Sequence, residues 1–318
     1  MLVAADGPSG TGRAAVRMVP DPGGPKVVAA AAAGERCGLK TCGSVSGLTL
    51  RAPQYGSEMS DLEEALTVRA DGEGWTAFAD PRYESTNAMF GGWTTAIALR
   101  ATLRSADDGA LPSAITVNFV DRVEPGSEVH ARGRCVGRTR SVEHWSTELI
   151  SADEQTLAVA TVVLSNRRET DGHTQFSMPD VPDPESLGEF HPPGPQGERS
   201  MIRPVTGYPP YGRGDTTSTH WVREMTGRPV DHLQLAFLAD QFAPRPFFWS
   251  DEPRLSATLC MSVYFHATTD EVAAVGDDYI VGEATGSRGE SSTSGQHARL
   301  WSRSGALLAT TEQLHWYR

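Results

Sequence analysis

Apolar and polar residues begin to alternate in short runs from Thr67 onward. In the clearest run, the apolar residues Ile115, Val117 and Phe119 alternate with polar ones. A period of two is typical of a strand with one buried face. Further strand-like runs occupy residues 67–70, 75–79, 129–137, 142–151 and 156–165. This part of the chain is therefore predicted to fold as an antiparallel meander.

One segment of this half favours a helix instead. In residues 90–103, Trp93, Ile97 and the apolar positions of 99–101 supply a partly apolar face, and Gly91-Gly92 lies at the N-terminal end. The expected order of the half is strands, a helix, and then the long meander.

The same order recurs later in the chain. Residues 217–224 read as a strand, and residues 231–242 read as a helix whose first turn is preceded by Pro229. Strand-like runs follow at residues 256–266, 279–284, 297–302 and 307–317. The closing pairs are also alike, because Ala160-Thr161 has its counterpart in Ala309-Thr310. We infer an α+β fold made of a duplicated unit, each copy a long helix wrapped by an antiparallel sheet.

Composition divides the chain into four parts. All 24 aromatic residues lie at Tyr55 or later, and the preceding segment is rich in Ala, Gly and Pro. Such a segment cannot bury enough surface to offset its ordering entropy, so residues 1–58 are predicted to be a disordered extension. Prolines cluster in residues 169–210, which predicts an extended linker between units at residues 59–168 and 211–318.

Charge and composition exclude several classes of protein. The formal net charge is −12, which argues against a general nucleic-acid binder. No stretch approaches the ~20 apolar residues of a membrane span, so we expect no membrane partner and a cytoplasmic location. Four cysteines in 318 residues do not make a disulfide scaffold.

Motifs in both halves resemble the acyl-CoA thioesterase II family, in the family's order. The first half carries Met89-Phe90-Gly91-Gly92-Trp93. The matching pieces further along are Met178-Pro179, Trp221-Val222-Arg223, Leu238-Ala239-Asp240, Ala257-Thr258-Leu259, Tyr264-Phe265-His266 and Ala309 to Gln313. The resemblance covers about residues 66–318. It implies a double hotdog fold, a homo-oligomer, and hydrolysis of acyl-CoA thioesters without a cofactor or a metal.

The resemblance also implies the site. The family's water-positioning Asp, Thr and Gln fall on Asp240, Thr258 and Gln313 of this sequence. Asp240 continues the apolar stripe of Leu233 and Phe237 on the predicted helix, so its carboxylate is expected to face the core.

The two remaining members lie on predicted strands. Alternation places Thr258 on the same strand face as Cys260, Ser262 and Tyr264, opposite the apolar positions. The counterpart of Gln313 in the first half is Leu164, which favours one asymmetric site over two.

A second set of candidates lies at the start of the first helix. Gly91 and Gly92 allow a substrate carbonyl to approach free N–H groups at a helix N-terminus, where the helix dipole favours developing negative charge. Together with Trp93 they form the expected oxyanion and substrate-binding group. Close packing of the helix is the structural alternative for the two glycines.

Other chemistries find less support. No Gly-x-Ser-x-Gly elbow of a serine hydrolase occurs, and the histidines show no metal spacing such as His-Glu-x-x-His. Two alternatives stay open beside thioester hydrolysis. One is a hotdog dehydratase or hydratase, which needs a histidine with an acidic partner, and the other is a non-catalytic module that binds acyl thioesters.

Overall fold

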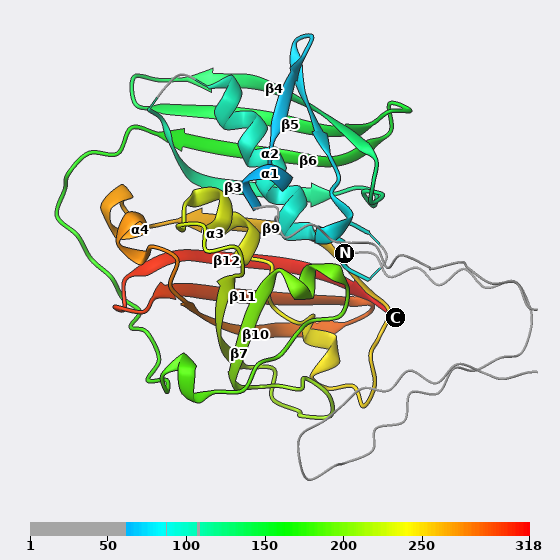
Figure 1. The fold of residues 1–318 in the computed structure, drawn as a ribbon, viewed down its shortest axis with the longest axis vertical. Coiled ribbons are helices and arrows are strands. Elements are labelled where there is room, and N and C mark those ends of the chain that lie inside the picture. The colour runs from blue at the N-terminus through cyan, green and yellow to red at the C-terminus, as the bar shows by residue number, and fades with distance from the viewer. Residues whose placement is uncertain (1–61, 87, 107–108) are drawn as a thin grey trace, which may run out of the picture. The chain divides into compact units, whose positions relative to one another are not determined.

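The computed structural model describes residues 62–86, 88–106 and 109–318 (Figure 1). The predicted extension, residues 1–58, lies outside the described residues. Within the described part, the chain is α+β, and its strands form one antiparallel sheet.

Six strands come from each half of the described chain. The first half contributes β1 (Val68–Asp71), β2 (Gly74–Phe78), β3 (Leu111–Phe119), β4 (Glu128–Arg138), β5 (Val142–Ser151) and β6 (Thr156–Ser165). The second half contributes β7 (Ser200–Thr206), β8 (Ser218–Glu224), β9 (Ser256–Phe265), β10 (Ile280–Glu290), β11 (Thr293–Ser302) and β12 (Leu307–Tyr317). Strands β5, β6 and β12 have the predicted bounds. The other predicted strands are present with shifted ends, and the largest shift is at β10, which ends at Glu290 and not at Ala284.

The order of the strands in the sheet is mirrored about its centre. It runs β1-β2-β4-β5-β6-β3-β9-β12-β11-β10-β8-β7. Setting aside the edge strands β1 and β7, each half follows the same order from its outer side to the centre. The halves meet where β3 pairs with β9, with Ile115 opposite Val263 and Val117 opposite Met261. The backbone ladder therefore continues from one half into the other.

The two main helices differ in length. Helix α2 (Gly91–Ser105) lies across the strands of the first half (Figure 1). Its side chains Trp93, Ile97 and Leu99 are all fully buried. Helix α3 (His232–Leu238) has seven residues, fewer than the predicted 231–242. The backbone tightens after Leu238, where the Gln241 N–H donates to the Leu238 carbonyl at 3.1 Å, and the Phe237 carbonyl lies close to Gly92 of α2. The helix ends there, and Asp240 lies in the following turn.

Two further structured segments were not expected from the pattern. Helix α4 (Thr269–Val275) begins with a capping box formed by Thr268 and Glu271. Strand β7 lies inside the predicted linker and pairs with β8, which buries Ile202 opposite Val222. Its Pro204 is compatible with an edge strand, where one side needs no ladder donors.

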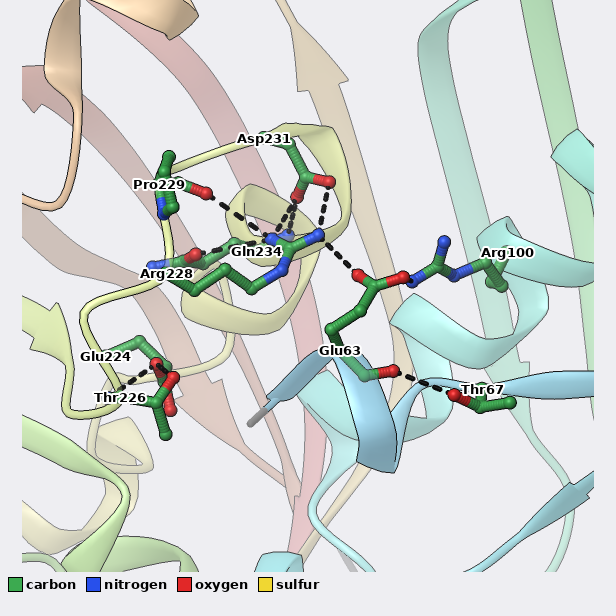
Figure 2. A network of polar contacts seen from close by, with 9 residues as sticks. All are labelled: Glu63, Thr67, Arg100, Glu224, Thr226, Arg228, Pro229, Asp231 and Gln234. Carbon is green, nitrogen blue, oxygen red and sulfur yellow. Dashed lines mark hydrogen bonds and ion pairs between the residues drawn. The ribbon is translucent and has the colours of Figure 1, made fainter. Parts of the chain in front are cut away.

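A network of charges joins α1, α2 and the start of α3 (Figure 2). Glu63, in helix α1 (Leu62–Ala65), pairs with Arg100 of α2 and with Arg228 at 2.7 Å. Arg228 also binds Asp231 at 2.7 Å, and Asp231 caps α3 by accepting from the Gln234 N–H at 2.8 Å. The hydrogen bond to Asp231 raises the pKa of Arg228, against the effect of burial. The network fixes the beginning of α3 against α1 and α2.

Candidate active site

Asp240 and Gln313 are in direct contact. Gln313 lies on β12, and its Nε2 donates to Asp240 Oδ1 at 3.0 Å. Both side chains are buried, at 8% and 4% exposure. The structure therefore brings together two of the three predicted water-positioning residues, from a turn after α3 and from the last strand.

The N-terminus of α2 lies against the same carboxylate. The Gly92 N–H forms a hydrogen bond with Asp240. A Cβ at Gly91 would lie 2.7 Å from Asp240 Oδ2, and a Cβ at Gly92 would collide with the Phe237 carbonyl oxygen. Only residues without a side chain allow this approach. The two glycines thus permit close packing of the start of α2 against the turn after α3, and the Gly92 N–H faces a protein carboxylate.

Burial dominates the acidity of Asp240. It raises the pKa of this carboxyl from 3.8 to about 6, while the hydrogen bonds from Gln313 and from the Gly92 backbone lower it. The balance leaves a carboxyl that ionises close to neutral pH. Such a group can accept a proton more readily than an ordinary aspartate.

Thr258 faces the interior through a β-bulge, and the predicted face was wrong. Along β9, Met261 pairs with Gln313 and Cys260 pairs with Leu314, but His315 pairs with Thr258. Leu259 is the extra residue, and its side chain is 38% exposed. A bulge inserts one residue and reverses the alternation beyond it. Thr258 is therefore buried at 5% exposure, on the same face as Met261.

Thr258 and Gly91 line one small hollow. Its volume is about 20 Å³, and its lining includes Thr94 and Phe119. A larger hollow, of about 120 Å³, lies around the hairpin of residues 138–143 and shares no lining residue with it. The small hollow is therefore the one that adjoins the N-terminus of α2.

Trp93 lies apart from this group. Its side chain is fully buried in the core, and its indole Nε1 donates to the Ala65 carbonyl at 2.9 Å. It does not line the small hollow. Trp93 forms a packing contact between α1 and α2, and this contact gives no support to the predicted substrate-binding role.

The structure adds polar neighbours that the sequence analysis does not single out. Gln296 of β11 lies directly opposite Gln313, and Ser294 lies opposite His315. All are buried. Burial lowers the pKa of His315 to about 3, so its imidazole is neutral. The available signal was the alternation of β11, because Ser294 and Gln296 share a strand face with the apolar Ala298 and Leu300.

Among residues 62–86, 88–106 and 109–318, no group of three or more His, Cys, Asp or Glu side chains could hold a metal ion. In that part of the chain, no helix is both long enough and apolar enough to span a membrane.

Solved structures share the fold. A conserved protein of unknown function with a hot dog fold from Alicyclobacillus acidocaldarius is 29% identical, with a TM-score of 0.77 over 81% of this chain and 97% of that one. A putative thioesterase II from Thermobifida fusca is 18% identical, with a TM-score of 0.71 over 82% and 98% of the two chains. A TesB protein from Mycobacterium avium subsp. paratuberculosis is 20% identical, with a TM-score of 0.68 over 80% and 97%.

Comparison by sequence gives the family. The search of curated proteins finds no match. The profile of the acyl-CoA thioesterase N-terminal domain matches residues 79–165, and the profile of the C-terminal domain matches residues 176–317. Because both domains are present in order and together span most of its length, the chain belongs to the acyl-CoA thioesterase family.

Proposed function

We propose that the protein hydrolyses acyl-CoA thioesters to a free acid and coenzyme A, with a water held by Asp240, Gln313 and Thr258. The observation that carries the proposal is the buried contact of Gln313 Nε2 with Asp240 Oδ1, at 3.0 Å, in a chain of this family. A carboxylate with a raised pKa beside an amide is suited to bind and deprotonate water.

Each group has a separate part in the reaction. Asp240 accepts a proton from the water as its oxygen attacks the thioester carbon. Among the described residues, the buried Gln313 Oε1 has no hydrogen-bond partner, so it can accept the water's second hydrogen. The tetrahedral intermediate collapses by breaking the C–S bond, and the protonated Asp240 returns its proton to the departing sulfur, so coenzyme A leaves as the thiol and Asp240 is again ionised.

The oxyanion of that intermediate needs hydrogen-bond donors. The Gly92 N–H is already directed at Asp240. We assign the role to the Gly91 N–H and the Thr258 hydroxyl, because both residues line the small hollow beside the carboxylate. Trp93 has no part in this assignment.

We also interpret the two halves as two hotdog repeats. The mirrored strand order and the one main helix in each half support this interpretation. The repeats are unequal, since Asp240, Thr258 and Gln313 all come from the second half. One site per chain follows from that asymmetry, with the N-terminus of α2 as the contribution of the first half.

The alternative of a dehydratase or hydratase requires a histidine with an acidic partner. On the strand face that carries Gln313, the histidine is His315; its pKa is lowered to about 3, and among the described residues it forms no ion pair with a carboxylate. The other alternative, a binding module without catalysis, predicts acyl-CoA binding without thiol release.

A thiol-release assay across acyl-CoA chain lengths tests the proposal. Gln313→Met keeps the side-chain volume but removes the amide donor and acceptor. Turnover should therefore fall by about 10²-fold, the usual effect of removing one preorganised polar group. Glu312→Gln is the matched control, because Glu312 is exposed on the opposite face of the same strand. Absence of thiol release with every acyl-CoA, or equal turnover in the two variants, would contradict the proposal.

A further inference from the structure

Buried polar side chains gather on the inner face of β11 and β12, beside Asp240. Within the part of the chain that the structure describes, five side-chain groups there have no hydrogen-bond partner: the Gln296 amide, the Ser294 and Thr311 hydroxyls, His315 Nδ1 and Gln313 Oε1. Each of these residues is at most 4% exposed.

Strand register places these groups side by side. Gln296 is opposite Gln313, Ser294 is opposite His315, and Thr311 is opposite Ala298. Directly opposed residues on neighbouring antiparallel strands point to the same face of the sheet. Gln313 reaches Asp240 from this face, so the other members lie on the substrate side of the sheet.

Packing of the protein does not account for this polarity. A buried polar group without a hydrogen bond costs about 1–3 kcal/mol, and Gln296 presents both a donor and an acceptor. An apolar residue at position 296 would fold at lower cost. Clusters of such groups call for an explanation outside the fold, and a polar ligand is one that fits a site beside a reactive carboxylate.

Arg245 strengthens the polar character of the same region. It is fully buried, and its guanidinium donates to the carbonyls of Ala243, Thr216 and Ala284 and to the Ser218 hydroxyl. Within the described residues, none of its hydrogen bonds reaches a carboxylate. Its side chain covers Gly286, which lies opposite Gln296 on the neighbouring strand. An unneutralised positive charge here favours ligand atoms with oxygen lone pairs.

We propose that Gln296, with Ser294 and His315, forms a subsite that binds a hydroxyl group on a short acyl chain. The inference rests on the proposed function and names its substrate class as hydroxyacyl-CoA. Neighbouring strands are ~4.8 Å apart, so the backbone of Gln296 lies at about that distance from the backbone of Gln313, the residue proposed to hold the water. A hydroxyl on the third or fourth carbon of the acyl group falls at that distance from the thioester carbon.

The test compares butyryl-CoA, 3-hydroxybutyryl-CoA and succinyl-CoA as substrates of the full chain. For the wild type, kcat/KM for the hydroxylated substrate should exceed that for butyryl-CoA by about tenfold or more, since a site with unpaired polar groups rejects the analogue that lacks the hydroxyl. Gln296→Leu should lower this ratio by at least about tenfold. His297→Leu, one residue along β11 and on its other face, should leave the ratio unchanged.

Stability is measured in parallel. Gln296→Leu should keep or raise the unfolding midpoint, because it removes a buried unpaired amide. Should that variant fail to fold, Ser294→Ala replaces it and is expected to reduce the ratio in the same direction.

The outcomes separate the subsite from the hydrolysis. Equal use of butyryl-CoA and 3-hydroxybutyryl-CoA, or a ratio that Gln296→Leu and Ser294→Ala leave unaltered, would overturn the inference. A preference for succinyl-CoA over both would also overturn it, and would assign the site to a carboxylate read by Arg245. Without any thiol release the proposed hydrolysis fails, but the stabilisation of the protein by each thioester, measured by thermal shift, still decides the subsite.

Discussion

Replacing Asp240 with asparagine should raise stability and abolish most activity. An ordinary aspartate titrates near 3.8, and burial raises the pKa of Asp240 to about 6. The folded state therefore holds this proton more tightly than the unfolded chain does. The resulting stabilisation is complete below pH 3.8 and is lost as the pH rises through about 6.

The size of the effect follows from the shift. About two pKa units correspond to about 3 kcal/mol of unfolding free energy that the ionised carboxylate forfeits at pH 8. Asparagine does not ionise, so the variant avoids this loss. The asparagine side chain has one acceptor oxygen, whereas the carboxylate has two. It can therefore accept fully from only one of its two donors, and the hydrogen bond from either Gln313 or Gly92 weakens. The variant should therefore be more stable than the wild type at pH 8 by about 1–2 kcal/mol.

Activity should change in the opposite direction. Without a group that can take the proton of the attacking water, turnover should fall by on the order of 10²–10⁴-fold, while KM changes little. Urea unfolding at pH 4 and pH 8, and thiol release per folded molecule, give both quantities from one preparation.

Two results would refute this reasoning. If the stability difference between Asp240→Asn and the wild type did not grow in favour of the variant between pH 4 and pH 8, the carboxyl would not have a raised pKa. If turnover per folded molecule stayed near normal, Asp240 would have no role in the chemistry, and the binding-module alternative would gain support.

Three further predictions follow from the geometry. The kcat/KM of the wild type should rise with pH through about 6 and then level off, because only the ionised Asp240 can accept a proton; a flat profile between pH 4.5 and 8 would contradict this. Gly92→Ala should lower the free energy of unfolding by about 1–3 kcal/mol through its collision with the α3 backbone, whereas Gly137→Ala, where the added Cβ meets open space, should change the urea midpoint little. Arg228→Ala should lower the free energy of unfolding by about 1–3 kcal/mol, since it removes the partly buried hydrogen bonds of Figure 2. Arg132→Ala breaks an exposed ion pair and should leave the urea midpoint nearly unchanged, so equal midpoints for these two variants would contradict the importance of the network.

Strand positions were predictable because apolar and polar residues alternate along a strand that has one buried face. The runs at 142–151, 156–165 and 307–317 have period two throughout or are apolar between clear turns, and their bounds were predicted correctly. The orientation of Thr258 was not predictable in this way. A bulge is decided by pairing with β12, and the sequence of β9 alone continues its alternation past Leu259 without a break.

The end of α3 also could not be predicted from the local pattern of apolar residues. The residues after Leu238 continue an apolar stripe, so periodicity extends the helix through Asp240. The helix ends where the Phe237 carbonyl lies against Gly92 of α2, a close approach between residues far apart in the chain. The consequence for the site is favourable: Asp240 lies in a turn, where its carboxylate can meet both Gln313 and the start of α2.

The continuous ladder between β3 and β9 affects how the protein could be divided. Separating the halves within the linker would convert an internal strand pair into two open sheet edges, each with a row of unpaired N–H and C=O groups around Val117 and Met261. Exposed edges of this kind recruit strands from other molecules. Either half produced alone should therefore aggregate or exchange strands, whereas mixing the two during refolding should restore solubility as the halves close each other's edges.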